Sequence, residues 1–132
     1  MLGPAQICLT SALAHHDLTD AIPDTLDVAI PRGGRSPATE RAITWHQFDA
    51  ATFDLGRDEI PIEGTDLSIG LYSPERCIAD AFRLRGQLGY ETARDALKEW
   101  LRRGGKPNTL MRIALQLPRA KTPILHALET LS

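Results

Sequence analysis

Two adjacent histidines and four aspartates lie close together near the start of the sequence, in the segment SALAHHDLTDAIPDTLDVAIPRGGR at residues 11–35. Metal ligands on a helix share one face at positions i and i+4, whereas the neighbours His15 and His16 would point about 100° apart. Cys8 lies about two helical turns away, and no nearby glutamate or cysteine completes a ligand set. We therefore predict no metal site here and interpret one histidine as packing against or capping a helix end.

Pairs of acidic residues are a second candidate for catalytic chemistry. Asp24 with Asp27, or Asp58 with Glu59, could bind Mg²⁺ in a nuclease or a nucleotidyltransferase. A nucleotidyltransferase needs two carboxylates that alternate on one strand after a Gly-Ser helix start, and the segment LDV offers only one. The sequence also lacks the Gly-x-Ser-x-Gly elbow of a serine hydrolase. We predict a protein without catalytic residues, metal or cofactor. The alternative is a small metal-dependent phosphotransferase or nuclease that uses Asp24, Asp27 and Asp58.

A glycine-containing basic loop follows, in the segment PRGGRS at residues 31–36. Backbone N–H groups of such a loop can hold a phosphate, but a P-loop requires GxxxxGK[ST] and a dinucleotide-binding loop requires GxGxxG. Neither pattern is present in this segment. The composition favours a flexible connection between strands, with Arg32 and Arg35 as an alternative contact for an anion or a nucleic acid.

The charges are unevenly divided along the 132 residues, although the net charge is only −2. Residues 1–72 hold 4 Lys and Arg against 11 Asp and Glu, a balance of −7. Residues 73–132 hold 11 Lys and Arg against 6 Asp and Glu, a balance of +5. Basic helices could attract an acidic partner or a phosphate backbone, or their side chains could simply cover solvated faces.

Positive charge is densest in the segment WLRRGGKPNTLMR, residues 100–112, around the end of one predicted helix and the start of the next. Helical spacing places Arg76 with Arg83, and Lys98 with Arg102, on polar faces where they can line up. We predict a surface that binds nucleic acid or a partner protein. Its residues are Arg83, Arg94, Lys98, Arg102, Arg103 and Lys106, with Arg32 and Arg35 as a second patch.

Length and composition are those of one ordinary globular domain. Hydrophobic residues make up 42% of the chain and charged residues 24%. No apolar run approaches the roughly 20 residues that span a bilayer, and the first residues do not have the pattern of a signal peptide. Cys8 and Cys77 form neither a disulfide framework nor a CxxC clip. We predict a single cytoplasmic domain over residues 1–132, with both thiols buried or half-buried.

The first half of the chain predicts one helix followed by strands. Helical spacing of apolar residues indicates a helix over about Ala5–His16. Alternating apolar residues predict four strands, at Leu26–Pro31, Arg41–Phe48, Glu59–Glu63 and Leu67–Leu71. The last two would form a hairpin. Phe53 and Leu55 could belong either to the core or to a dimer surface.

The second half predicts four helices. Ser73 is the expected N-cap of the first, with Pro74 at its first position and Gly89 at its end. The others are expected in YETARDALKEWLRRGG, KPNTLMRIALQLP and KTPILHALETL, the last capped by Thr122 with Pro123 at its first position. This segregation favours an α+β fold with an N-terminal helix, a small mostly antiparallel β-sheet and a C-terminal group of about four helices.

Two segments carry a resemblance to a known family. One is SALAHHDLTDAIPDTLDVAIPRGGR, and the other is LYSPERCIADAFRLRGQLGYETARDALKEWLRRG. They resemble the C-terminal domain of the AbiEi-type antitoxins, in which a segment like SAL..H.LTD..P precedes a strand ending in Pro-Arg and a segment like SPER.I.D..R opens the helical half. The resemblance covers most of the chain, from about Cys8 to Arg103.

The resemblance implies a non-catalytic antitoxin of a type IV toxin–antitoxin or abortive infection system. Such antitoxins counter a nucleotidyltransferase-like toxin and repress their own operon by binding DNA. The usual member has a winged helix-turn-helix domain ahead of this one, whereas this chain begins at Met1 almost where the second domain should begin. We therefore expect that domain to be absent and any DNA binding to come from the basic helices. A further alternative is a remnant whose function was lost with that domain.

Overall fold

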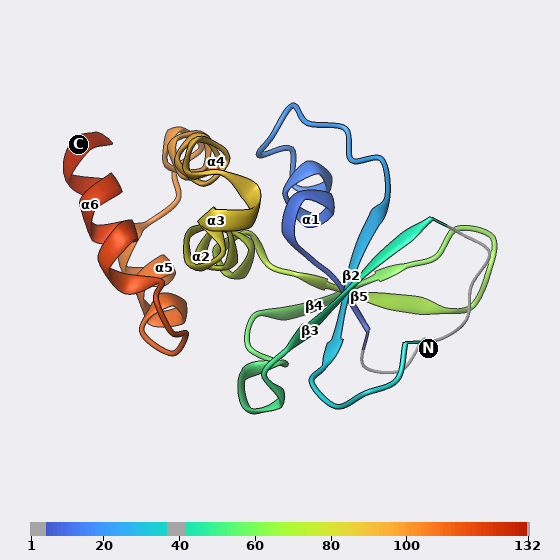
Figure 1. The fold of residues 1–132 in the computed structure, drawn as a ribbon. Helices are drawn as coiled ribbons and strands as arrows, with labels where there is room; N and C mark the ends of the chain where they lie inside the picture. Colours follow the sequence, from blue (N-terminus) through green and yellow to red (C-terminus); the bar gives the residue numbers. More distant parts are fainter. Residues whose placement is uncertain (1–4, 37–41, 132) are drawn as a thin grey trace.

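The predicted α+β class is confirmed by the computed structural model, which describes residues 5–36 and 42–131 and places a five-stranded sheet beside a group of helices (Figure 1). The strands are β1 (Gln6–Ile7), β2 (Leu26–Pro31), β3 (Ile43–Phe48), β4 (Arg57–Pro61) and β5 (Ser68–Tyr72). The helices are α1 (Leu9–His15), α2 (Pro74–Arg83), α3 (Arg85–Leu88), α4 (Tyr90–Arg102), α5 (Pro107–Ala114) and α6 (Lys121–Leu131), with a short 3-10 helix at Ala50–Thr52.

Several predicted bounds shift in the structure. The first helix begins only at Leu9, because Gln6 and Ile7 form a strand in the middle of the sheet. The helix expected from Pro74 to Gly89 is divided into α2 and α3, and α6 begins at Lys121 rather than at Pro123. The strand at 26–31 is confirmed and the hairpin strands are displaced by one or two residues, while Arg41 lies outside the described residues.

The prediction of a mostly antiparallel sheet is wrong, because the sheet is mixed. The strand order is β3-β2-β1-β5-β4, in which β1 runs antiparallel to β2 but parallel to β5, and β2 runs parallel to β3. Only β4 and β5 form the expected antiparallel hairpin. A parallel pair requires a connection that returns along the strands. The sequence of an irregular loop does not show whether the two strands that it connects will pair in antiparallel or in parallel orientation.

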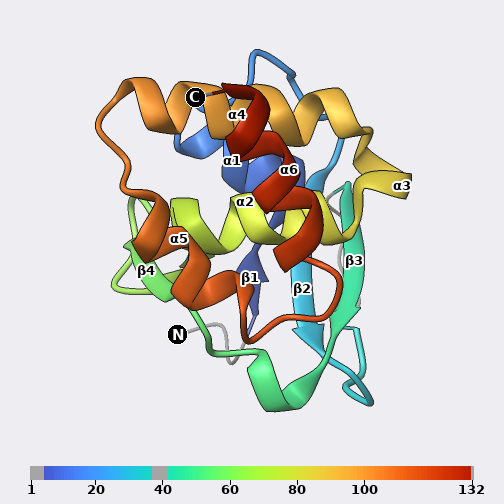
Figure 2. The ribbon, with the colours of Figure 1, turned by 90° about the vertical axis from the view of Figure 1, so that its left-hand side faces the viewer.

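The main core lies between the sheet and the helices, with α2 at its centre (Figure 1, Figure 2). Helix α2 packs against α1, α4, α5 and α6, so most of its residues are buried. Phe53 and Leu55 both pack in this core. A smaller apolar cluster around Val28 and Ile30 lies on the other face of β2. Within the described residues, no helix combines the length and the apolar composition needed to cross a bilayer.

Helix α2 begins where the sequence predicts. The Ser73 side chain accepts a hydrogen bond from the backbone N–H of Arg76, and Pro74 occupies the first helical turn. A serine N-cap satisfies one of the free N–H groups of the first turn, and proline loses nothing there because its missing N–H has no helical partner. The start of α2 is therefore fixed directly after β5.

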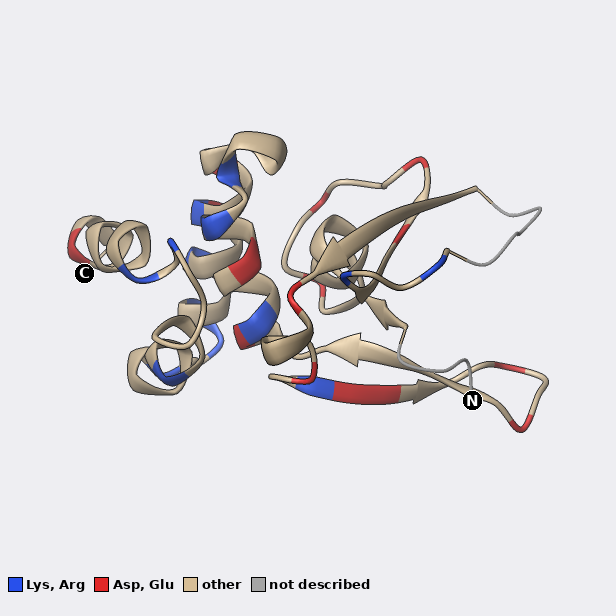
Figure 3. Ribbon diagram, turned by 60° about the horizontal axis from the view of Figure 1, so that its bottom comes forward, with Lys and Arg blue, Asp and Glu red and all other residues tan. Residues whose placement is uncertain are grey.

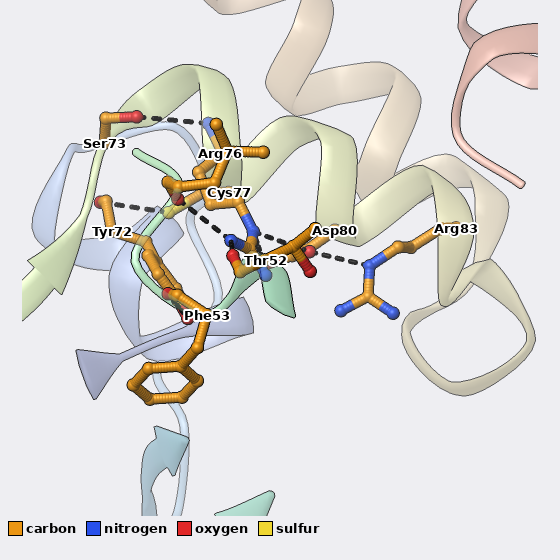
Figure 4. Close-up of polar contacts among 9 residues, drawn as sticks. Thr52, Phe53, Tyr72, Ser73, Arg76, Cys77, Asp80 and Arg83 are labelled. Atoms are coloured by element: carbon orange, nitrogen blue, oxygen red, sulfur yellow. Dashed lines mark hydrogen bonds and ion pairs between the residues drawn. The ribbon is translucent and has the colours of Figure 1, made fainter. Parts of the chain in front are cut away.

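The helical spacing places Arg76 on a polar face, but in the structure its side chain is completely buried. Figure 4 shows its polar contacts. Its Nε donates to both carboxylate oxygens of Asp80 at 3.1 and 3.0 Å. Its Nη1 donates to the backbone carbonyls of Thr52 and Leu55 at 2.7 and 2.9 Å, and its guanidinium lies 4.2 Å from the centroid of the Tyr72 ring. Arg76 thereby joins α2, the last strand and the segment that precedes β4.

Gly56 makes room for this arginine. A Cβ atom at this position would lie 2.7 Å from the Cβ of Arg76, and the Gly56 backbone has a φ of +75°. Both the short approach and the positive φ favour glycine. The close approach lets the preceding carbonyl of Leu55 reach the guanidinium.

We predict that Asp80→Asn lowers the free energy of unfolding by about 3 to 5 kcal/mol, because it leaves a buried guanidinium without its counter-charge. The measurement is urea unfolding followed by circular dichroism. The matched control is Asp95→Asn on α4, whose carboxylate pairs with Arg94 at 3.2 Å on the surface. An exposed pair of this kind contributes about 1 kcal/mol or less. A similar loss of unfolding free energy in the two variants would contradict the conclusion that the buried guanidinium of Arg76 depends on Asp80.

Candidate anion-binding site

A cavity of about 500 Å³ lies between the edge strand β3 and the helices. Its three walls are β3 with the residue that follows β2, the junction of α2 and α3, and the turn between α5 and α6, which approaches β3 in Figure 2. Each wall contributes one arginine, namely Arg32, Arg83 and Arg119. We call this space the arginine cavity.

Arg83 is held most firmly of the three arginines. Its Nε donates to Asp80 Oδ1 at 2.8 Å, and its guanidinium lies 4.8 Å from the centroid of the Phe48 ring. The side chain is only 11% exposed, and Figure 4 shows its two Nη groups turned away from Asp80. Since no described residue bonds to these Nη groups, their N–H donors are available to a ligand.

The other two arginines make few polar contacts with the described residues. Arg32 Nη2 lies 3.5 Å from the Gln47 carbonyl, and the Arg119 side chain makes no hydrogen bond or ion pair with a described residue. Asp49 is the one acidic residue among the described lining, and its carboxylate accepts the N–H of Ala51. Asp80 lies behind the wall and is shared between Arg83 and the buried Arg76, so the four arginines 32, 76, 83 and 119 face only two carboxylates, Asp49 and Asp80. The resulting positive potential favours an anion.

His46 also lines the cavity and is part of a hydrogen-bonded chain. Its Nε2 lies 3.0 Å from Asp27 Oδ1, and the other oxygen of Asp27 accepts from the Ser11 hydroxyl at 3.2 Å. A Ser-His-Asp hydrolase instead places the histidine between the serine and the carboxylate. Here the carboxylate of Asp27 lies between Ser11 and His46. These hydrogen bonds therefore connect α1 with β2 and β3 and do not activate the serine.

The two thiols are unsuited to nucleophilic chemistry. Cys8 and Cys77 are both fully buried, which confirms the prediction that the thiols are buried or half-buried. Burial raises the pKa of each thiol well above its ordinary value, and the nearby Asp80 carboxylate raises it further. A reactive cysteine needs a lowered pKa and some exposure.

Three arginines of the predicted basic surface on and beside α4 form ion pairs with acids of the same helix. Arg102 binds the carboxylate of Glu99 with Nε and Nη2 at 2.7 and 2.6 Å, and Arg103 Nε reaches the same carboxylate at 2.9 Å. Arg94 pairs with Asp95. These three arginines are therefore weaker anion contacts than the sequence predicts.

Arg103 also has a structural role that the sequence did not indicate. It donates to the backbone carbonyl of His16 at 2.9 Å and to that of Asp17, which joins α4 to the end of α1. The side chain of His16, the C-cap residue of α1, bonds through Nε2 to the Tyr72 carbonyl at 2.8 Å. The prediction that one of the two histidines packs at a helix end is thus confirmed for His16.

The remaining predicted residues fall into two groups. Arg32 and Arg83, which belong to different predicted patches, meet at the arginine cavity. Arg35, Lys98 and Lys106 are exposed and make no ion pair with a described residue, but they do not line this cavity. Only Arg32 and Arg83 of the predicted binding residues therefore line the arginine cavity.

Two further lining residues with side chains that could meet an anion, Arg119 and His46, were not among the predicted binding residues. Arg119 follows Pro118 in the turn before α6, and nothing in its local pattern distinguishes it from the other basic residues of the helical half. His46 lies between Trp45 and Gln47 on a strand, which is equally typical of a half-buried structural position. Only the packing of the helices against the sheet edge brings these side chains together.

The acids of the alternative metal site are dispersed. Asp27 is occupied by His46 and Ser11, Asp24 is exposed in the loop before β2, and Asp58 lies on β4. Strands β2 and β4 are separated by β1 and β5, which puts their backbones about 14 Å apart. Among the described residues, no group of three or more His, Cys, Asp or Glu could hold a metal ion.

Figure 3 shows how the charges of the two halves are distributed in space. Most basic segments lie on the helices, whereas most acidic segments lie on the strands and loops of the sheet half. Basic residues on the sheet side include Arg32 and Arg35, which follow β2, and Arg57 at the start of β4. The arginine cavity forms where this basic loop faces the basic helices.

No protein-family model and no curated protein matches this chain. The resemblance to AbiEi-type antitoxins therefore stays a prediction from the quoted motifs.

The pairing of Glu99 with Arg102 and Arg103 can be tested through the pKa of the Glu99 carboxyl. The hydrogen bonds from Arg102, and then from Arg103, lower the pKa of Glu99 from its ordinary 4.5 to about 2. A lowered folded pKa means that the ionised carboxylate stabilises the fold above pH 4.5, and that this contribution is lost as the pH falls towards 2. We expect an NMR titration of the side-chain carboxyl to show a midpoint near 2.

The control for this titration is the double variant Arg102→Gln and Arg103→Gln. Without the two guanidinium groups, the pKa of Glu99 should rise towards 4.5. An unchanged midpoint would show that the two arginines do not hold the carboxylate in solution.

Proposed function

We propose that this protein is a non-catalytic antitoxin-like domain that counters a nucleotidyltransferase-like toxin in the cytoplasm, and that it acts by holding phosphate groups of a nucleic acid in the arginine cavity. The antitoxin role follows the resemblance of the two quoted segments. The binding role rests on one observation: Arg32, Arg83 and Arg119 come from three separate parts of the fold and line one cavity.

The chemistry of the three side chains supports a phosphate ligand. A guanidinium offers several N–H donors in a rigid plane that matches the oxygens of a phosphate. Arg83 is already oriented by Asp80 and Phe48, so little of its conformational freedom would be lost on binding. Arg32 and Arg119 are the less restrained donors that can adjust to the ligand.

The size of the cavity supports a small phosphate-bearing unit. Its volume of about 500 Å³ lies in the usual range for small-molecule sites, roughly 300 to 1,000 Å³. The paired arginines of α4, by comparison, would have to give up their contacts with Glu99 before meeting a phosphate. We therefore assign the cavity rather than α4 as the main anion contact.

The test is growth rescue when this chain is co-expressed with the nucleotidyltransferase-like toxin that the resemblance predicts. We expect the native chain to restore growth and the double variant Arg32→Gln with Arg119→Asn to fail, because it removes two of the three cavity charges. Arg119 has a φ of +63°, and asparagine tolerates this conformation better than most residues. Circular dichroism and a thermal melt would check that the variant is folded.

The control is Arg112→Gln, which removes an exposed charge of α5 that does not line the cavity. It should rescue growth as well as the native chain does. Full rescue by the double variant would show that the cavity is not the antitoxin site, and no rescue by the native chain would contradict the antitoxin assignment.

A further inference from the structure

A second cavity of about 570 Å³ adjoins the arginine cavity on the helical side. It lies between the start of α4 and the start of α6, and its lining includes Arg85, Tyr90, Thr122 and His126. Arg119 lines both cavities. A positively charged side chain therefore stands at the boundary between two adjacent hollows, each with at least one further arginine.

The backbone holds Arg119 at this boundary. Its φ of +63° is uncommon for a residue other than glycine. The neighbouring Leu117 and Ala120 are both buried in the main core, so the turn around Arg119 is fixed from both sides. An unfavourable backbone conformation that surrounding packing imposes is a feature associated with ligand sites.

The second cavity adds an aromatic surface to the basic one. Tyr90 is 41% exposed, and one edge-to-face contact with Phe82, at 6.0 Å between centroids, orients its ring. Arg85 Nη1 donates to the Phe82 carbonyl at 2.8 Å, which leaves the other donors of that guanidinium without a described partner. An oriented, partly exposed ring beside arginines is the combination on which unpaired bases stack while the backbone is neutralised.

We propose that the two cavities together form a track for single-stranded nucleic acid, an inference that rests on the function proposed above and specifies its ligand. Phosphates would lie along Arg32 and Arg83, then Arg119, then Arg85, and one base would stack on Tyr90. A duplex does not fit this arrangement, because its bases present their faces to each other and not to a protein ring.

The track can be tested by fluorescence anisotropy with labelled oligonucleotides. The ligands are a mononucleotide, an eight-nucleotide single strand as RNA and as DNA, and the corresponding duplex. We expect the single strand to bind at least about tenfold more tightly than either the mononucleotide or the duplex. The affinity should fall with salt by about 0.7 log unit per log unit for each phosphate neutralised.

Variants of the second cavity separate stacking from charge. Tyr90→Leu keeps an apolar side chain against Phe82 but removes the stacking surface, and we expect it to weaken single-strand binding by about fivefold to 150-fold. Tyr90→Phe should bind like the native protein. Arg119→Asn should lower both the affinity and the salt dependence, whereas Arg112→Gln should lower neither appreciably.

The outcomes distinguish this inference from the proposed function. Duplex binding as tight as single-strand binding, or native affinity in Tyr90→Leu, would overturn the track. If growth rescue still depended on Arg32 and Arg119, the proposed function would stand with a different ligand. If rescue did not depend on them while the single strand bound as expected, the track would stand and the antitoxin mechanism would be wrong.

Discussion

The buried ion pair of Arg76 and Asp80 connects the two halves of this fold. A guanidinium without access to water depends on groups of the protein itself for its counter-charge and its hydrogen bonds. Arg76 finds its counter-charge in Asp80 on its own helix and donates from Nη1 to two backbone carbonyls of the segment before β4, while its buried Nη2 has no hydrogen-bond partner among the described residues. The segment that contains Thr52 and Leu55 is thereby fixed to α2, and with it the connection from β3 to β4.

The same carboxylate also shapes the candidate site. Asp80 accepts from Arg83 as well as from Arg76, so one buried acid serves an arginine of the core and an arginine of the cavity wall. The position of Arg83 is thus coupled to the packing of α2 rather than to the solvent. Arginines with such internal support differ from Arg102 and Arg103 at the end of α4, which share the carboxylate of Glu99 at the surface. Burial and pairing, rather than the number of basic residues, determine which charges can meet a ligand.

The sheet shows which strands the local alternation of apolar residues can predict and which it cannot. Alternating apolar residues indicated β2, β3 and the hairpin, because the side chains of a half-buried strand point alternately to the core and to water. The central strand β1 has two residues and so carries no period at all. Its pairing with both β2 and β5 makes the sheet mixed, and this pairing depends on residues more than 20 positions away in the sequence.

The sequence by itself determined the features that depend on neighbours within one or two helical turns. These include the Ser73 cap, the proline that follows it, the amphipathic helices of the second half and the α+β order of elements. The spacing of Arg76 and Asp80 at i and i+4 is visible in the sequence, but only the tertiary structure decided that Arg76 is buried. It alone also decided that residues 32, 83 and 119 share a cavity. Helical spacing places a charge on a face of a helix but does not say what packs against that face. A site assembled from distant segments therefore exists only once the helices have packed against the sheet.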